Sequence, residues 1–190
     1  MMKTRSVLAA AAVGLMGAGV LGACAPAAPA PAPDPDPDAV TTTTAVEFAC
    51  TGTGIIGPGG ASPVGPIADQ TVDVDVTLPG AVTAGANFDV LVDVDNLVFA
   101  ATGAPGFVNL NAAGIVAEID VDGAAGPATV AANNFVGNGL SIDLGVAATT
   151  ATAAAGTNTV ETGQIRILSG STGFVCTPTG AGASASVEAS

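Results

Sequence analysis

Cysteine and carboxylate are the side chains of this chain whose number and spacing suggest chemistry. Its 190 residues include no His and no Tyr, its single Lys is Lys3, and Arg166 is the one basic residue beyond position 5. Catalytic triads and imidazole metal sites need His, and Schiff-base or Ser-Lys mechanisms need Lys. Because no set of nucleophile, base and oxyanion donor can be assembled, we predict that the chain is not an enzyme.

Carboxylates dominate the charge of the chain. Sixteen Asp and Glu residues against three basic ones give a formal net charge of −13. Nucleic-acid binding depends on Lys and Arg that neutralise phosphates, so we expect no nucleic-acid partner. Carboxylate pairs can also hydrolyse glycosides. Sugar sites usually need aromatic platforms, however, and the only aromatic residues here are six Phe.

One acidic run suggests a metal ion. Oxygen-bearing side chains alternate in EIDVDG, residues 118–123, as at the start of a calcium-binding loop. Thr129 stands where a bidentate Glu would close such a loop, and the alternation also continues a strand pattern. We therefore interpret the acids as a solvated strand face and keep calcium as the alternative cofactor. The residues of that alternative site are Asp93, Asp95, Asn96, Asp120 and Asp122.

Residues 1–23 have the features of an export signal. MMKTR supplies a positive start, and an Ala- and Gly-rich apolar run follows it. The run is slightly short for a transmembrane helix and has no basic flank after it. Its last residues and Cys24, in the order Leu-Gly-Ala-Cys, resemble the lipobox of bacterial lipoproteins.

The lipobox resemblance implies a location. In such proteins the signal is cut before the cysteine, here Cys24, which carries a diacylglyceryl thioether and often a fatty acyl group, such as palmitate, on the new N-terminus. Two acyl chains suffice for stable anchoring. We therefore expect an extracytoplasmic protein bound to the cell membrane through its lipid. Ordinary cleavage within residues 23–27, which would release a secreted protein, is the alternative.

A linker and a tail are expected on either side of the folded domain. Residues 24–45 are rich in Pro, Ala, Asp and Thr. Proline tracts adopt polyproline II at about 3.1 Å per residue, so the linker's Pro-rich part would span roughly 40 Å. Residues 180–190 lack periodicity and bulk, and we expect a disordered tail there.

Residues 46–179 alternate apolar and polar side chains, which predicts strands with one wet face. The runs are TVDVDVTL, NFDVLVDVDN, IVAEIDVDG, GLSIDLGV and QIRIL. In GLSIDLGV the residues expected to face inward are Leu140, Ile142, Leu144 and Val146. The number and spacing of the runs predict an all-β fold, an antiparallel β-sandwich of seven to nine strands, with a closed β-barrel as the alternative.

The sandwich expectation is strengthened by a resemblance. The run VDVTLPGAVTAGANFDVLVDV, residues 74–94, resembles the opening strands of immunoglobulin-like domains. A Cys-Thr near the first strand and a Phe-x-Cys near the last are similar to those of uncharacterised secreted or cell-surface proteins of actinobacteria. That resemblance implies an immunoglobulin-like sandwich and no known activity.

The two remaining cysteines are expected to pair. With Cys24 assigned to lipid, Cys50 and Cys176 are an even pair in an exported chain, which meets an oxidising compartment. We predict a disulfide that joins the first and last strands, with two buried free thiols as the alternative. A non-catalytic domain, stapled in this way, would stand on a stalk at the cell envelope in a structural or interaction role.

Two other functions stay open. One is a calcium-dependent adhesion module, and the other is a lipoprotein that holds a small apolar ligand inside the domain. In every case the expected partners are the membrane, through the anchor, and an unidentified envelope or extracellular molecule.

Overall fold

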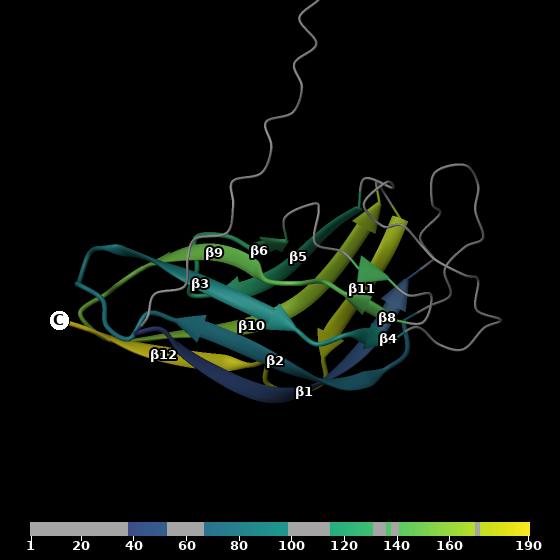
Figure 1. Cartoon of the computed structure of the whole chain (residues 1–190), viewed down its shortest axis with the longest axis horizontal. Helices are drawn as coiled ribbons and strands as arrows, with labels where there is room; N and C mark the ends of the chain where they lie inside the picture. Colours follow the sequence, from purple (N-terminus) through teal and green to yellow (C-terminus); the bar gives the residue numbers. More distant parts are fainter. Residues whose placement is uncertain (1–37, 53–66, 99–114, 131–135, 138–140, 170–171) are drawn as a thin grey trace, which may run out of the picture.

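The computed structural model describes residues 38–52, 67–98, 115–130, 136–137, 141–169 and 172–190 (Figure 1). All elements in these residues are β-strands and none is a helix, which confirms the predicted all-β class. The signal segment and Cys24 lie outside them. The strands are β1 (Val40–Gly52), β2 (Gln70–Leu78), β3 (Asn87–Val94), β4 (Leu97–Val98), β5 (Ile115–Asp122), β6 (Ala128–Val130), β7 (Val136–Gly137), β8 (Ser141–Asp143), β9 (Ala147–Thr152), β10 (Gly156–Ser169), β11 (Thr172–Pro178) and β12 (Ser184–Ala189).

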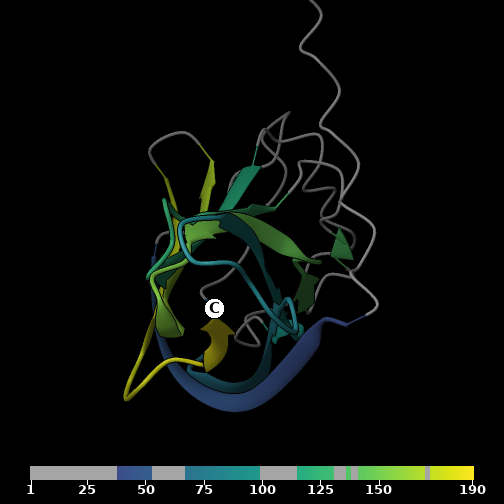
Figure 2. The same ribbon diagram turned by 90° about the vertical axis from the view of Figure 1, so that its left-hand side faces the viewer.

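Nine of the strands form one antiparallel sheet that closes on itself (Figure 2). Its order is β11-β1-β2-β3-β9-β6-β5-β10-β12, and β10 also pairs with β11. Every strand of this sheet except β12 belongs to the ring, so the ring is an eight-stranded barrel. Within it β5, β6 and β9 lie side by side and β10 returns to pair with β5, which is a Greek-key arrangement. β4, β8 and β7 form a small second sheet.

The immunoglobulin-like sandwich is not confirmed, and the alternative, a closed barrel, matches the strand pairing. A sandwich would keep two sheets with separate edges packed face to face. Here the long strand β10 prevents that separation, because one of its edges pairs with β5 and the other pairs first with β12 and then with β11. Its register with β5 shifts between Thr162 and Ile165, an irregularity of the kind that bends a sheet.

The strands are staggered around the ring. If the directly paired residues are followed once around the ring from Thr41 on β1, the path comes back to β1 at Thr51, ten residues further along. The residues between them are Thr77, Leu91, Ala148, Thr129, Glu118, Arg166 and Val175. Such a stagger tilts the strands against the barrel axis, and an eight-stranded barrel has an interior that side chains can fill.

Small and β-branched side chains fill this interior. Val76, Val90, Val92 and Ile119 are fully buried in it. The predicted alternation is confirmed in β2 and β3, where the Val and Phe side chains point inward and the Asp side chains outward.

The predicted inward set is wrong at one position. Ile142 and Leu144 are buried, but Val146 is 41 % exposed and Ala147 is buried instead. Gly145, with a φ of 67°, adopts a left-handed conformation that glycine tolerates without strain, and the side-chain alternation reverses after it. Leu140, the fourth residue of that set, lies outside the described residues.

The predicted tail and linker also need correction. Residues 184–189 form β12, with Ala185 and Val187 buried against the core, in place of a disordered tail. β12 is secured because it pairs with β10 along its whole length. At the other end, β1 begins at Val40, inside the predicted linker, since Val and Thr favour strands as soon as the Pro tract ends.

Different strand ends lie at the two ends of the barrel. At the end that we call the stalk end, β1 begins beside Leu78, and a bridge between Val82 and Ala189 places the C-terminus nearby (Figure 1). At the opposite, far end, β1 finishes at Gly52 and β10 meets β11. Val40, the first residue of β1, and Ala189, at the end of β12, therefore lie at the same end of the barrel.

Candidate functional site

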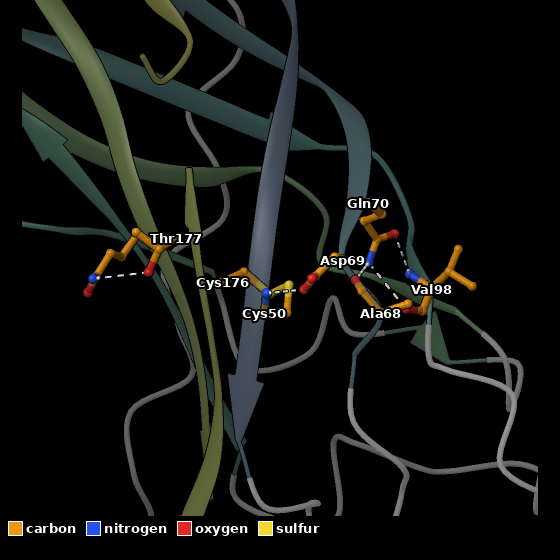
Figure 3. Close-up of a disulfide and its surroundings, with 8 residues drawn as sticks. Cys50, Ala68, Asp69, Gln70, Val98, Cys176 and Thr177 are labelled. Carbon is orange, nitrogen blue, oxygen red and sulfur yellow. Dashed lines mark hydrogen bonds between the residues drawn. A yellow bond between two sulfur atoms is a disulfide. The ribbon is translucent and has the colours of Figure 1, made fainter. Parts of the chain in front are cut away.

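The predicted disulfide between Cys50 and Cys176 is confirmed. The two residues lie directly opposite each other on β1 and β11, with their Cα atoms 4.0 Å apart (Figure 3). The bridge connects positions 126 residues apart, near the far end of the barrel. It fastens the pair of strands through which the first and the last part of the ring meet.

Polar side chains fix the strands beside this bridge (Figure 3). The backbone N–H of Cys50 donates to Asp69 Oδ1 at 2.8 Å, where the pairing of β1 with β2 has just ended. Gln70 Oε1 accepts the N–H of Val98 at 2.8 Å, and Gln70 Nε2 donates to the carbonyls of Ala68 and Val98. These bonds connect β1, β2 and β4, so the disulfide region is a structural one.

A group of four Asp residues lies on the outer face where β2 pairs with β3. Asp75 and Asp93 are direct cross-strand partners, and the N–H of Asp95 donates to the carbonyl of Asp73 at 3.0 Å. We call these four residues the acidic ladder. Like charges opposite each other across strands are destabilising, so the ladder costs the fold free energy unless something outside it supplies positive charge.

The electrostatics of the ladder show this cost. Partial burial raises the pKa of Asp93 above its ordinary value, and the charges of Asp143, Asp75 and Asp95 raise it further. The Oδ1 atom of Asp75 is buried and has no hydrogen-bond partner among the described residues. Asp143, on β8, directs its own carboxylate to the N–H of Gly145 at 2.8 Å. Among the described residues, no cation pairs with the carboxylates of the ladder.

The five residues of the predicted calcium site do not come together. Asp93 and Asp95 lie at the end of β3 and Asn96 follows them, whereas Asp120 and Asp122 lie on β5. Strands β9 and β6 separate β3 from β5 in the sheet. Within the described ranges, no group of three His, Cys, Asp or Glu side chains is placed to hold a metal ion.

The acids of β5 differ from those of the ladder because a cation, Arg166, lies beside them. Its guanidinium makes an ion pair with Asp120 and lies 3.7 Å from Glu118, which is its direct partner across β5 and β10. It is the one basic residue beyond position 5 of the sequence. The only such cation is thus already engaged, on a strand well removed from the ladder.

A feature that the sequence reading missed lies beside the ladder, on β1. The carbonyl of Glu47 accepts the N–H of Thr179, whereas the N–H of Cys50 points the other way, toward Asp69. Since successive residues of a strand direct their backbone groups to opposite edges, Thr41, Thr43 and Ala45 direct theirs away from β2. No described strand pairs with them there, because β11 joins β1 only from Phe48 onward.

We call the backbone groups of Thr41, Thr43 and Ala45 the free edge. The signal that could have revealed it was the run VTTTTAV, residues 40–46, since β-branched residues favour strands. Because this run follows the Pro-rich tract, most of it falls within the linker that the sequence predicts.

No helix within the described ranges is long and apolar enough to span a membrane. No family model, curated protein or solved structure matches this chain. The inferences about function therefore rest on its own residues.

Proposed function

We propose that this chain is a lipid-anchored lipoprotein on the outer side of the cell membrane, which displays a non-catalytic β-barrel on a proline-rich stalk for a structural or interaction role. The use of the cysteines is the observation that carries the proposal. Cys50 and Cys176 are bonded to each other, so Cys24, in its lipobox-like setting, is the one cysteine left over. Structural disulfides of this kind belong to oxidising compartments.

The direction in which the barrel is attached also supports display. The Pro tract runs into β1 at the stalk end, so a chain anchored at Cys24 would present the far end of the barrel away from the membrane. The barrel wall would stand in solution, and its acidic residues would keep it there, since charge of one sign resists association with other acidic surfaces.

The two alternatives have less support. A small apolar ligand would need space in the barrel, and side chains such as Val76, Val90 and Ile119, which would line that space, are fully buried among their neighbours. Calcium-dependent adhesion is favoured only by the acidic ladder, in which no three carboxylates of the described residues are spaced for a metal ion. Calcium that raises the melting temperature more than NaCl of equal ionic strength would favour adhesion, and an equal rise would not.

Metabolic labelling tests the anchor. Cells that express the full chain are grown with a palmitate analogue that can be tagged, and the purified protein is examined for label. We expect label on the wild type and none on Cys24→Ala, because the thioether and the cleavage both require this sulfur. The matched control is Cys50→Ser, which should keep the label. An unlabelled wild-type chain contradicts the proposal.

A further inference from the structure

We infer that the free edge of β1 binds an extended, positively charged peptide segment of a partner, which adds to the barrel wall as a further strand beside the acidic ladder. The partner named here rests on the interaction role proposed above. Strand addition of this kind supplies affinity through backbone hydrogen bonds and specificity through alternate side chains. The free edge offers three N–H and three C=O groups, from Thr41, Thr43 and Ala45.

Among the described residues, no paired strand, bulge, Pro or charged side chain protects this edge at Thr41, Thr43 and Ala45. Proteins protect exposed edges with charged side chains, Pro, bulges or a covering element. Residues 39–46 contain no charged residue and no Pro, and β1 pairs with β2 without interruption from Val40 to Phe48. A regular, uncharged strand with an unpaired edge is a template for one more strand.

The inward side of this edge has room for apolar side chains. β12, which would be the next strand of the wall, does not pair with β1 but is bonded to the segment around Val82. As a result Val40, at an inward position of β1, is 57 % exposed, and Thr42 is exposed as well. Apolar residues at every second position of an added strand would pack on these side chains and would themselves become buried.

The outward side calls for positive charge. Thr43 lies directly opposite Asp75, and Ala45 lies opposite Asp73, so two carboxylates of the ladder are one strand away from the edge. A Lys or Arg at an outward position of an added strand could lay its long stem over the small Thr43 and Ala45 side chains and bring its charge to these carboxylates. Within the described residues the one basic side chain, Arg166, is already engaged by Glu118 and Asp120.

This charge argument selects the occupant. A second copy of the chain could pair edge to edge, but it would bring another acidic ladder close to the first and add repulsion in place of relief. A basic strand instead removes the cost of the ladder and is drawn to it over long range. The pattern expected in the partner is therefore alternation of Lys or Arg with Val or Ile.

The test uses the purified full-length chain and a short labelled peptide that alternates Lys and Val. Fluorescence anisotropy at low salt should show one peptide bound per chain, with affinity that falls as salt increases. Thr43→Pro removes an edge N–H without cutting a bond to β2, and we expect it to weaken binding about tenfold. Thr43→Val, the matched control, keeps the N–H and should bind like the wild type.

Two further arms separate edge pairing from general attraction to an acidic protein. Asp75→Asn should weaken binding and reduce its salt dependence, whereas Asp122→Asn, on the other side of the barrel, should do neither.

N-methylation of the peptide amides tests the backbone hydrogen bonds and leaves the protein unchanged. One peptide is methylated on its Lys residues and another on its Val residues, whose amides point to opposite edges of the added strand. We expect one of these two peptides to lose binding and the other to keep it. Equal loss from both peptides, equal loss in Asp122→Asn, or self-association of the chain through β1 would overturn the inference. Since the peptide assay needs no lipid, its failure is distinct from failure of the labelling experiment.

Discussion

At the scale of single residues, Asp93 shows what the acidic ladder costs. It lies opposite Asp75, within reach of Asp95 and Asp143, and burial and these charges raise its pKa. The folded state therefore holds the Asp93 proton more tightly than the unfolded state, whose Asp pKa is about 3.9. Stability that is present below the unfolded pKa is lost as the pH rises through the folded pKa.

Asp93→Asn should consequently stabilise the barrel at neutral pH. The neutral amide removes the repulsion, and cross-strand pairs of this kind contribute about 0.2–1 kcal/mol. Urea unfolding as a function of pH measures the effect, which should shrink toward pH values near the unfolded pKa. Asp89→Asn is the matched control, because Asp89 is on the same strand but faces Thr150, and should change stability little. A destabilised Asp93→Asn variant would show that the hydrogen bond of this carboxylate with the backbone of Val94 outweighs the repulsion.

At the scale of elements, the last strand depends on close approach of two backbones. The N–H of Thr162 donates to the carbonyl of Ala183, and the N–H of Ala183 donates back to Thr162 Oγ1. Gly182 makes this possible, because a Cβ there would lie 1.7 Å from the carbonyl oxygen of Thr162. β12 can then turn away from β11 and run along β10.

Gly182→Ala should therefore destabilise the domain, by about 1–3 kcal/mol if the backbones must move apart. Gly180→Ala is the control two residues earlier, where a Cβ meets nothing within 4 Å. Thermal unfolding of both variants gives the comparison, and hydrogen exchange of β12 amides shows whether the loss is local. Equal melting temperatures for the two variants would rule out the crowding at Gly182.

The elements also show what the sequence could predict. Alternation identified β2, β3 and β5 because each has one wet face, and it placed their inward residues correctly wherever the structure describes the side chains. It could not reveal how the sheet closes, since the pairing of β10 with β11 and β12 depends on close backbone contacts at Gly173 and Gly182 that leave no periodic signal. β12 was missed because its inward residues are mostly Ala, too small to mark a core face, and the ladder's Asp residues could be listed by sequence but not assigned to neighbouring strands.

At the scale of the whole molecule, the disulfide closes the barrel where its first and last parts meet. It spans 126 residues, and on the chain-entropy model a loop of that length stabilises by about 5 kcal/mol, an upper value. That is comparable to the net stability of a small domain. A core of Val and Ala with few aromatics makes such a staple important, because small side chains bury little apolar area each.

Removal of the bridge should therefore lower stability by about 2–5 kcal/mol. The double variant Cys50→Ser with Cys176→Ser, compared with the wild type in urea without reductant, measures the difference. The wild type in reductant should approach the double variant. Identical unfolding midpoints in all three conditions would contradict a stabilising role for the bridge.

The anchored, stapled barrel has one direct test, which is the intact mass of the mature protein extracted from membranes of a bacterial host. We expect a chain that begins at Cys24, carries a diacylglyceryl group with or without a further acyl chain, and lacks the two hydrogens lost in the Cys50–Cys176 disulfide. A mature chain that begins elsewhere, or begins at Cys24 without lipid, would contradict it.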